Sequence, residues 1–213
     1  MPNTPGSAST VLEILGESAS GKQALRGRIR AERRERPRSA RLSDGEALAA
    51  VVLEMPEVAA ADCVALYASI AGEPETEPLR TALRRAGVRV LLPVTQPQDG
   101  LDWAEDTGEL VPGVGPGGPE PTGPRLGEGG IRAADVVLVP ALAVDTLGSR
   151  LGQGAGSYDR ALQHVRTSVP VVALVNEGEL LDAAVESVPT EAHDVGVDAV
   201  VTPSRCLRLP ARG

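Results

Sequence analysis

Aromatic side chains are scarce in this sequence of 213 residues, which contains no Phe, one Trp and two Tyr. RNA-binding modules stack bases on aromatic side chains, so this scarcity argues against an RNA-recognition fold. The net charge of −8 means that no overall electrostatic field attracts nucleic acid or an anionic membrane surface. We therefore expect neither nucleic acid nor a membrane as a partner, and a core filled by Val, Leu and Ala.

Cysteines and long apolar runs are also few. Cys63 and Cys206 are too few for a disulfide framework or a zinc cluster, and neither belongs to a CxxC pair. The N-terminus lacks a basic segment followed by an apolar run, and the longest apolar stretch, Val136 to Val144, has nine residues including Pro140. These features predict a soluble, unsecreted protein in a reducing compartment, most simply the cytoplasm.

The length suits one α/β domain rather than two. Hydrophobic residues make up 42% and charged residues 23%, as in ordinary globular proteins, although Gly and Pro together number 42. We expect a flexible leader at residues 1–19, a single α/β domain at 20–204 and a short tail at 205–213. We also expect a monomer.

Basic residues concentrate near the N-terminus. Residues 22–41 hold nine basic and two acidic residues, a net +7, so the other 193 residues carry a net −15. Leu25 and Ile29 lie four residues apart and the segment stops at Pro37, which predicts a helix with a narrow apolar stripe and a cationic surface. A nucleic-acid arm is one interpretation of that surface, and a solvated basic face is the one we prefer.

After this helix, strand-like and helix-like segments alternate. The strand-like segments are short, β-branched and nearly continuous in apolar character, as expected for strands buried on both faces. They lie at residues 63–68, 88–92, 136–139, 171–175 and 199–201. Helices are predicted at residues 43–55, with Ser43 as the N-cap, and at 77–86 and 158–165. The alternation predicts a mostly parallel sheet with helices on both faces, a three-layer Rossmann-like arrangement. The Gly/Pro-rich residues 106–130 are interpreted as a surface loop, with an active-site flap as the alternative.

The segment with the clearest chemistry is residues 145–160, DTLGSRLGQGAGSYDR, which follows a buried strand and runs into a predicted helix. Gly152, Gly154 and Gly156 leave room for backbone amides to turn toward an anion, and Arg150 can neutralise it. Because there is no Walker lysine and the spacing is not the dinucleotide fingerprint, the glycines alone fit a tight connection as well as a phosphate site. The location at the carboxyl end of a predicted central strand favours the phosphate site.

Several blocks of sequence, taken together and in order, resemble the 5-formyltetrahydrofolate cyclo-ligases, also called methenyltetrahydrofolate synthetases. The blocks are Lys22-x-x-Leu25-Arg26, GEPET at residues 72–76, Leu92-Pro93, Val139-Pro140 followed by Asp145, RLGxGxGxYDR at residues 150–160, and Glu191-x-His193-Asp194 with Asp198. The resemblance implies ATP- and Mg²⁺-dependent conversion of 5-formyltetrahydrofolate, with or without a polyglutamate tail, to 5,10-methenyltetrahydrofolate, ADP and phosphate.

The resemblance also implies roles for single residues. It implies that ATP contacts Lys22, Arg26, Arg150, Leu151, Gly152, Gln153, Gly154, Ala155, Gly156, Ser157 and Tyr158. It implies folate contacts at Glu75, Gln153, Gly154, Ala155, Gly156 and Ser157, and Mg²⁺ ligands at Asp159 and Asp194. Lys22, Arg150 and Tyr158 are expected to act in the reaction itself. Without the resemblance, Asp159 at a helix start is better interpreted as a capping residue, and Glu75, Asp194 and His193 as residues of a helix entrance and a turn; His193 we keep as structural.

Lys22 is the only lysine beside 20 arginines. Since an ammonium and a guanidinium differ as point contacts to a phosphate oxygen, we interpret Lys22 as a specific phosphate contact with an exposed side chain that adds little stability. The family commonly has Tyr at the positions of Gln153 and Ser157 and Phe at that of Val144, which predicts weaker packing against the pterin. Two alternative functions stay open: a catalytically weak folate-binding or regulatory homologue, and a generic nucleotide- or sugar-phosphate-binding Rossmann-like protein.

Overall fold

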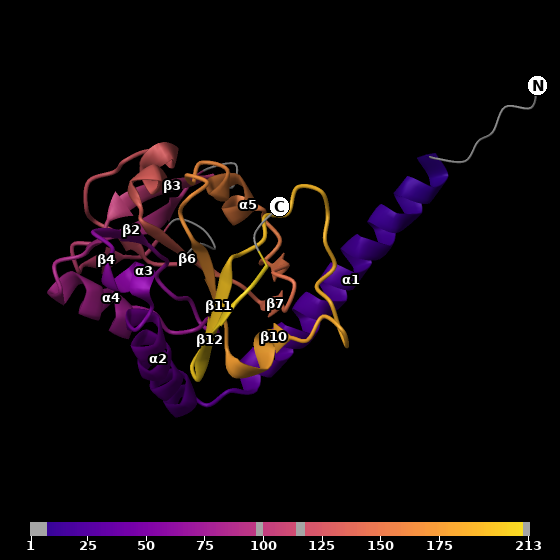
Figure 1. The fold of residues 1–213 in the computed structure, drawn as a ribbon, viewed down its shortest axis with the longest axis horizontal. Helices are drawn as coiled ribbons and strands as arrows, with labels where there is room; N and C mark the ends of the chain where they lie inside the picture. Colours follow the sequence, from indigo (N-terminus) through magenta and orange to yellow (C-terminus); the bar gives the residue numbers. More distant parts are fainter. Residues whose placement is uncertain (1–7, 97–99, 114–117, 211–213) are drawn as a thin grey trace, which may run out of the picture.

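A seven-stranded sheet in the order β12-β11-β9-β6-β1-β2-β3 forms the centre of the computed structural model (Figure 1). The structure describes residues 8–96, 100–113 and 118–210, with side chains from Ser18 onward. Its strands are β1 (Cys63–Ala65), β2 (Arg89–Thr95), β3 (Leu101–Glu105), β6 (Val136–Pro140), β9 (Val171–Leu174), β11 (Ala199–Thr202) and β12 (Arg205–Arg208). The five inner strands run parallel, whereas the edge strands β3 and β12 run antiparallel to their neighbours. The predicted mostly parallel sheet is confirmed.

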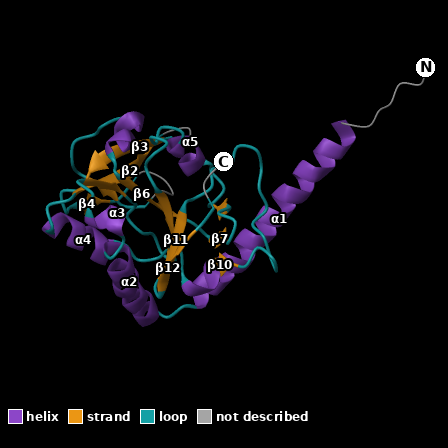
Figure 2. Cartoon of the chain, in the orientation of Figure 1, coloured by secondary structure: helices purple, strands orange, loops and turns teal. Residues whose placement is uncertain are grey.

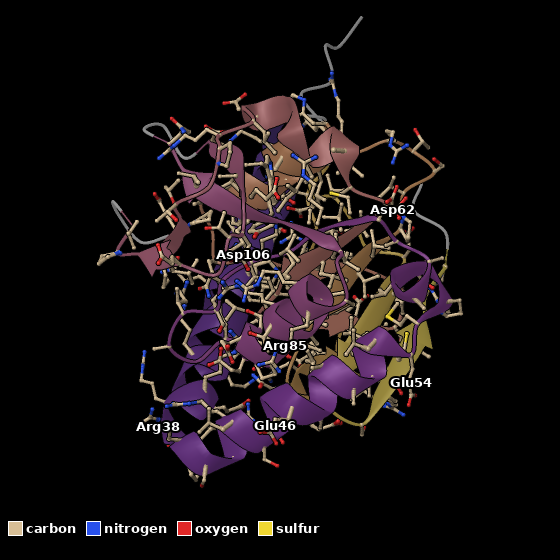
Figure 3. The ribbon with its side chains drawn as sticks, turned by 90° about the vertical axis from the view of Figure 1, so that its left-hand side faces the viewer. Arg38, Glu46, Glu54, Asp62, Arg85 and Asp106 are labelled. Atoms are coloured by element: carbon tan, nitrogen blue, oxygen red, sulfur yellow. The ribbon has the colours of Figure 1, made fainter. Side chains whose placement is uncertain are left out.

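Helices cover both faces of this sheet (Figure 2). They are α2 (Arg38–Leu53), α3 (Pro56–Ala59), α4 (Glu77–Arg85) and α5 (Ser157–Leu162), with the 3-10 helices η2 (Glu128–Ala133) and η3 (Glu177–Glu179). Successive residues of β6 alternate between two cores: Leu138 packs in one core with Leu48 of α2, and Val139 packs in the other with Ala161 of α5. This alternation is what a strand buried on both faces requires, and it produces the predicted three layers. Figure 3 shows α2 and α4 from outside, with exposed charges such as Glu46 and Arg85 on their outer side.

The N-terminal helix α1 (Ala8–Glu35) lies outside these layers, and its first half extends away from the rest of the molecule (Figure 1). Its Leu25 and Ile29 pack against Leu142, Ala143, Leu151 and Val188. Several of these residues belong to a small sheet of β10 (Leu180–Leu181), β7 (Ala143–Asp145) and β8 (Arg150–Leu151), formed by the chain after β6. The predicted apolar stripe therefore packs α1 against the small sheet, beside the end of the central strand β6.

Four sequence-based expectations about the fold need correction. The leader is helical from Ala8 onward, and residues 1–7 lie outside the described residues. The expected tail contains β12, because a turn after Thr202 folds the chain back to pair with β11. Ser43 lies inside α2, which begins at Arg38, directly after Pro37 at the N-cap. The expected loop at residues 106–130 includes a hairpin of β4 (Leu110–Val111) and β5 (Glu120–Pro121) and the start of η2; residues 114–117 lie outside the described residues.

Within the part of the chain that the structure describes, no helix combines the length and the apolar character needed to span a membrane.

Candidate functional site

A pocket of about 410 Å³ opens beyond the carboxyl ends of the parallel strands. Tyr67 follows β1, Pro93 lies in β2, and Pro140 and Ala141 come from the end of β6. Residues of α1 and of the connection between β8 and α5 complete the wall. Ligands of open α/β sheets bind at this edge, so the pocket is the natural candidate for the functional site.

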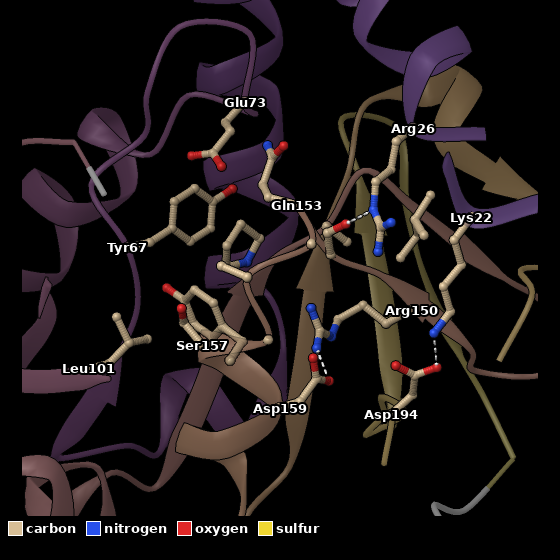
Figure 4. Close-up of a pocket in the computed structure, with 18 of the residues that line it drawn as sticks. Lys22, Arg26, Tyr67, Glu73, Leu101, Arg150, Gln153, Ser157, Asp159 and Asp194 are labelled. Carbon is tan, nitrogen blue, oxygen red and sulfur yellow. Dashed lines mark hydrogen bonds and ion pairs between the residues drawn. The ribbon is translucent and has the colours of Figure 1, made fainter. Parts of the chain in front are cut away.

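Every site residue predicted from the sequence lines this pocket except Glu75. Those that line it are Lys22, Arg26, Arg150, Leu151, Gly152, Gln153, Gly154, Ala155, Gly156, Ser157, Tyr158, Asp159 and Asp194. Figure 4 shows two sides of the pocket: Tyr67, Glu73 and Leu101 face one side, and Lys22, Arg26 and Arg150 face the other. Gln153 lies between the two groups. The pocket therefore has a cationic side and a side made of an acid and apolar or aromatic groups.

The loop from Arg150 to Gly156 depends on glycine for its shape. Gly154 has φ +114° and Gly156 has φ +69°, backbone conformations that side-chain-bearing residues rarely adopt. The loop is also tied to α1, because the Arg26 Nε donates to the Gly152 carbonyl oxygen at 3.0 Å. Arg30 donates to the backbone and side-chain oxygens of Gln153, both at 2.9 Å. Because α5 has only six residues, positive charge in this region comes mainly from arginine and lysine side chains rather than from a helix dipole.

Lys22 lies between two carboxylates. Its Nζ is 2.7 Å from Asp194 Oδ2 and 3.1 Å from Glu191 Oε2. Burial alone raises the pKa of Asp194, but hydrogen bonds from Lys22 and from the Glu191 amide outweigh burial and hold this pKa below its ordinary value. Only 6% of Lys22 is exposed, so the expectation of an exposed side chain is wrong. The ammonium lies inside the pocket wall because α1 packs closely on the body of the protein there.

Arg150 and Asp159 form a second ion pair in the pocket, with Arg150 Nη2 at 2.5 Å from Asp159 Oδ1. The same oxygen accepts a hydrogen bond from the Val195 amide at 3.2 Å. Asp159 thus orients Arg150 and connects α5 to the segment that carries Asp194. Neither predicted metal carboxylate is a free anion in this arrangement.

Three side chains at one end of the pocket could hold a cation. Ligand atoms of Glu191, His193 and Asp194 lie within 4.8 Å of one another. The two carboxylates suit Mg²⁺, a hard cation that prefers oxygen, whereas the His193 imidazole suits it poorly. Lys22 now supplies the positive charge between these carboxylates, and Asp159 does not belong to the group. A divalent cation therefore fits Glu191 and Asp194 only if the ammonium of Lys22 moves away.

The opposite side of the pocket carries a half-buried acid beside two phenols. Burial raises the pKa of Glu73, whose carboxylate accepts a hydrogen bond from the Ile70 amide at 3.2 Å. Burial also raises the pKa of Tyr158, and among the described residues its hydroxyl has no hydrogen-bond partner. The Tyr67 hydroxyl donates to the Pro74 carbonyl oxygen at 3.3 Å. A half-buried carboxylate and an unpartnered hydroxyl suit a ligand that supplies polar N–H or oxygen groups on a flat apolar body.

Glu75 lies outside the pocket. Its Oε1 accepts a hydrogen bond from the Ser69 hydroxyl at 2.5 Å, and its side chain packs against Gly45 of α2. Glu73, two residues earlier in the same GEPET block, lines the pocket instead. The block alone does not separate the two glutamates, because the turn at Gly72, with φ +92°, decides which one points inward.

Sequence reasoning also missed Tyr67 and Glu191 as residues of the pocket wall. Signals for both were present. Tyr67 is one of two tyrosines in a chain without Phe, and the other, Tyr158, lines the same pocket. Glu191 begins the block that contains Asp194, and its interaction with Lys22 depends on the fold.

Three comparisons with known proteins agree. The model of the 5-formyltetrahydrofolate cyclo-ligase family matches residues 18–203. A 5-formyltetrahydrofolate cyclo-ligase of Mycolicibacterium smegmatis is 37% identical over 193 residues, which cover 88% of this chain and 96% of the relative. One from Escherichia coli K12 is 34% identical over 172 residues, or 76% of this chain and 88% of the relative. The structure is similar to that of Aquifex aeolicus 5,10-methenyltetrahydrofolate synthetase, with TM-score 0.74 and 28% identity over 89% of this chain and 93% of the other.

Proposed function

We propose, since this chain belongs to the 5-formyltetrahydrofolate cyclo-ligase family, that it converts 5-formyltetrahydrofolate and ATP to 5,10-methenyltetrahydrofolate, ADP and phosphate. One observation carries this proposal: the motif blocks of the family, spread over most of the chain, meet around a single pocket. Lys22 and Asp194, 172 residues apart in sequence, are in direct contact there. A generic phosphate site would not require the blocks that contain Lys22 and Asp194 together with Glu73.

The cationic side of the pocket suits the phosphates of ATP. Lys22, Arg26 and Arg150 line it together with the glycine loop, whose backbone can approach an anion closely. In the proposed reaction the formyl oxygen attacks the γ-phosphorus, and the bond to the β-phosphate oxygen breaks to release ADP. Nitrogen 10 then attacks the activated formyl carbon and loses its proton to solvent, and phosphate leaves with the former formyl oxygen. This chemistry needs charge neutralisation and positioning more than proton transfer, which suits a chain with two histidines.

The proposed reaction includes Mg²⁺, which when bound would neutralise charge on the transferred phosphoryl group. Asp194 and Glu191 are the residues whose oxygen atoms best fit it. Asp159 stays a predicted ligand through Oδ2, because its Oδ1 is occupied by Arg150 and by the Val195 amide. Binding of the ion would free the Lys22 ammonium to contact a phosphate oxygen.

The acidic and aromatic side suits the pterin of the folate. A pterin presents neighbouring N–H donors at the edge of a flat ring, and a half-buried carboxylate such as Glu73 accepts hydrogen bonds from donors of that kind. Tyr67 and Tyr158 supply aromatic surface beside it. We therefore move the proposed folate contact from Glu75 to Glu73, and keep residues 153–157 between the two substrates.

The proposal is tested by mixing the purified protein with 5-formyltetrahydrofolate, ATP and Mg²⁺ and following the absorbance of the methenyl product. We expect the chromophore only when all three are present, since the phosphoryl group must be neutralised before the formyl oxygen can attack it. Formation at the same rate in excess chelator, or without ATP, would contradict the proposal. Folate binding without any chromophore would instead support the weak folate-binding homologue, which the loss of aromatic residues at Gln153 and Ser157 allows.

A further inference from the structure

Outside the pocket, Arg33 of α1 and Glu179 of η3 form a buried two-pronged ion pair. Arg33 Nε lies 2.6 Å from Glu179 Oε1, and Arg33 Nη2 lies 2.8 Å from Oε2. Each side chain is only 5% exposed. The pair is therefore a directional contact shielded from water, unlike the exposed pairs of the surface.

The partners of Arg33 lie just beyond the carboxyl ends of the central strands β6 and β9. Arg33 Nη2 also donates to the Ala141 carbonyl oxygen at 2.6 Å, and Ala141 lines the pocket directly after β6. Glu179 is itself held by the backbone amide and the side-chain amide of Asn176, both at 2.8 Å. Arg33 thus connects α1 to the end of the central strand and to a fixed carboxylate.

Arg33 and Lys22 share one face of α1. They are eleven residues apart, which in an α-helix is about three turns, or about 16 Å along the axis. Between them Leu25 and Ile29 are buried against the small sheet. Apolar contacts of this kind are not directional and allow a helix to slide or rotate slightly, whereas a two-pronged ion pair does not. Within the described part of the chain, the hydrogen bonds of Arg26 and Arg30 go to the glycine loop, which itself has to receive the ligand.

We propose that Arg33 and Glu179 are the positioning pair that sets where α1 presents Lys22 and Arg26 to the nucleotide. The inference rests on the proposed function, in which Lys22 leaves Asp194 and Glu191 to contact a phosphate oxygen. At that moment the middle of the helix loses its buried ion pair, and Arg33, near the C-terminal end of α1, keeps the register of the helix against the end of β6. Neither Arg33 nor Glu179 lines the pocket. Their charges do reach Glu73 on the folate side, and substitutions that keep both charges leave this effect in place, so what such substitutions change is the position of Lys22 and Arg26.

The test compares Arg33→Lys with Arg80→Lys. Arg80 makes the matching buried pair with Asp106, two hydrogen bonds of 2.9 Å between α4 and the end of β3, away from the pocket. Both substitutions keep the charge and remove a two-pronged contact, so both should lower the midpoint of thermal unfolding. Only Arg33→Lys should raise the KM for ATP, on the order of tenfold, while the KM for 5-formyltetrahydrofolate stays close to that of the wild type.

Equal ATP parameters in the two variants, or equal losses for both substrates in Arg33→Lys, would overturn the proposal. If Arg33→Lys does not fold, Glu179→Asp, which keeps both charges and shortens the contact, should show the same selective rise in KM for ATP. Failure of both to fold would assign the pair to stability alone. Calorimetric titration with ATP separates this inference from the proposed function. A wild type that binds ATP without turnover would contradict the proposed function alone. Weaker ATP binding by Arg33→Lys than by the wild type would still support the positioning pair, and equal ATP binding would contradict it.

Discussion

Lys22 shows how far a single residue depends on the fold around it. Its ammonium is buried between Glu191 and Asp194, so any replacement must satisfy both carboxylates and, under the proposal, a phosphate as well. An arginine has the same charge but a larger planar head group that does not fit the same point. Composition alone would make Lys22→Arg look harmless, since the chain has 20 other arginines.

We expect Lys22→Arg to reduce kcat/KM for ATP on the order of 10²-fold, the cost of misplacing one charge donor at a phosphoryl site. Because the side chain is buried, the unfolding midpoint should fall as well, contrary to the expectation for an exposed lysine. Arg28→Lys on the same helix is the control, since Arg28 pairs with Glu186 and is 46% exposed. Near-normal turnover by Lys22→Arg would reject the phosphate contact.

Glu73 gives a prediction that separates binding from stability. Burial raises the pKa of this carboxyl group above the ordinary value of 4.5, so the folded protein holds the proton more tightly than the unfolded chain does. The resulting stabilisation is full below pH 4.5 and is lost as the pH rises through the raised pKa. Glu73→Gln should therefore raise the unfolding midpoint at neutral pH, and this advantage should disappear below pH 4.5.

The same substitution should weaken folate binding on the order of tenfold or more, because hydrogen bonds to a charged acceptor are lost. Glu75→Gln provides the comparison, since Glu75 lies outside the pocket. If Glu75→Gln weakens folate binding and Glu73→Gln does not, the assignment made from the sequence was right and the one made from the structure is wrong.

Among the elements, α1 differs most from its appearance in the sequence. Its arginines suggested a solvated cationic surface, yet several of them bind other parts of the protein. Arg28 binds Glu186, Arg30 binds Gln153 and Arg33 binds Glu179. Arg36, directly after the helix, binds Asn176 and Asp44. These side chains bind α1 to the acidic remainder of the chain, so fewer of its arginines are left to contact a nucleic-acid partner.

Gly27 offers a test of α1 as an element. It is exposed in the middle of the helix, and an added Cβ would meet no atom within 4 Å. Gly27→Ala should therefore stabilise the protein by roughly 0.5–1 kcal/mol, because glycine disfavours helix interiors. Denaturant unfolding measures the gain. Unchanged kinetic constants are expected, and a destabilised variant would show that α1 is not a regular helix at this point.

The inner strands were predictable because burial on both faces leaves an apolar run, as in residues 136–139, that no other element explains as well. Edge strands have no such run. β3 has the sequence LDWAE, in which acidic residues interrupt the apolar ones, and β12 has the sequence RCLR, so each depends on its neighbour in the sheet for recognition. The helical start of α1 was missed because its Ser and Gly residues are typical of a leader.

At the scale of the whole molecule, the parts of the site that are contiguous in sequence could be predicted, whereas contacts between residues far apart in sequence could not. The loop at residues 150–159 carries its glycines, Arg150 and Asp159 in one stretch, so a motif suffices. The interaction of Lys22 with Asp194 spans 172 residues and exists only once α1 has packed beside the central sheet. Similarly, whether Glu73 or Glu75 faces the pocket depends on a turn whose geometry three-dimensional packing decides.

In the proposed function, the γ-phosphoryl group of ATP passes to the formyl oxygen of 5-formyltetrahydrofolate while both substrates are bound in this pocket. The most direct measurement repeats the chromophore assay with substrate carrying ¹⁸O in the formyl group, and determines the mass of the released phosphate. We expect one ¹⁸O in phosphate for each methenyl product formed, because the formyl oxygen leaves bonded to phosphorus. Absence of the chromophore, or unlabelled phosphate beside labelled water, would contradict it.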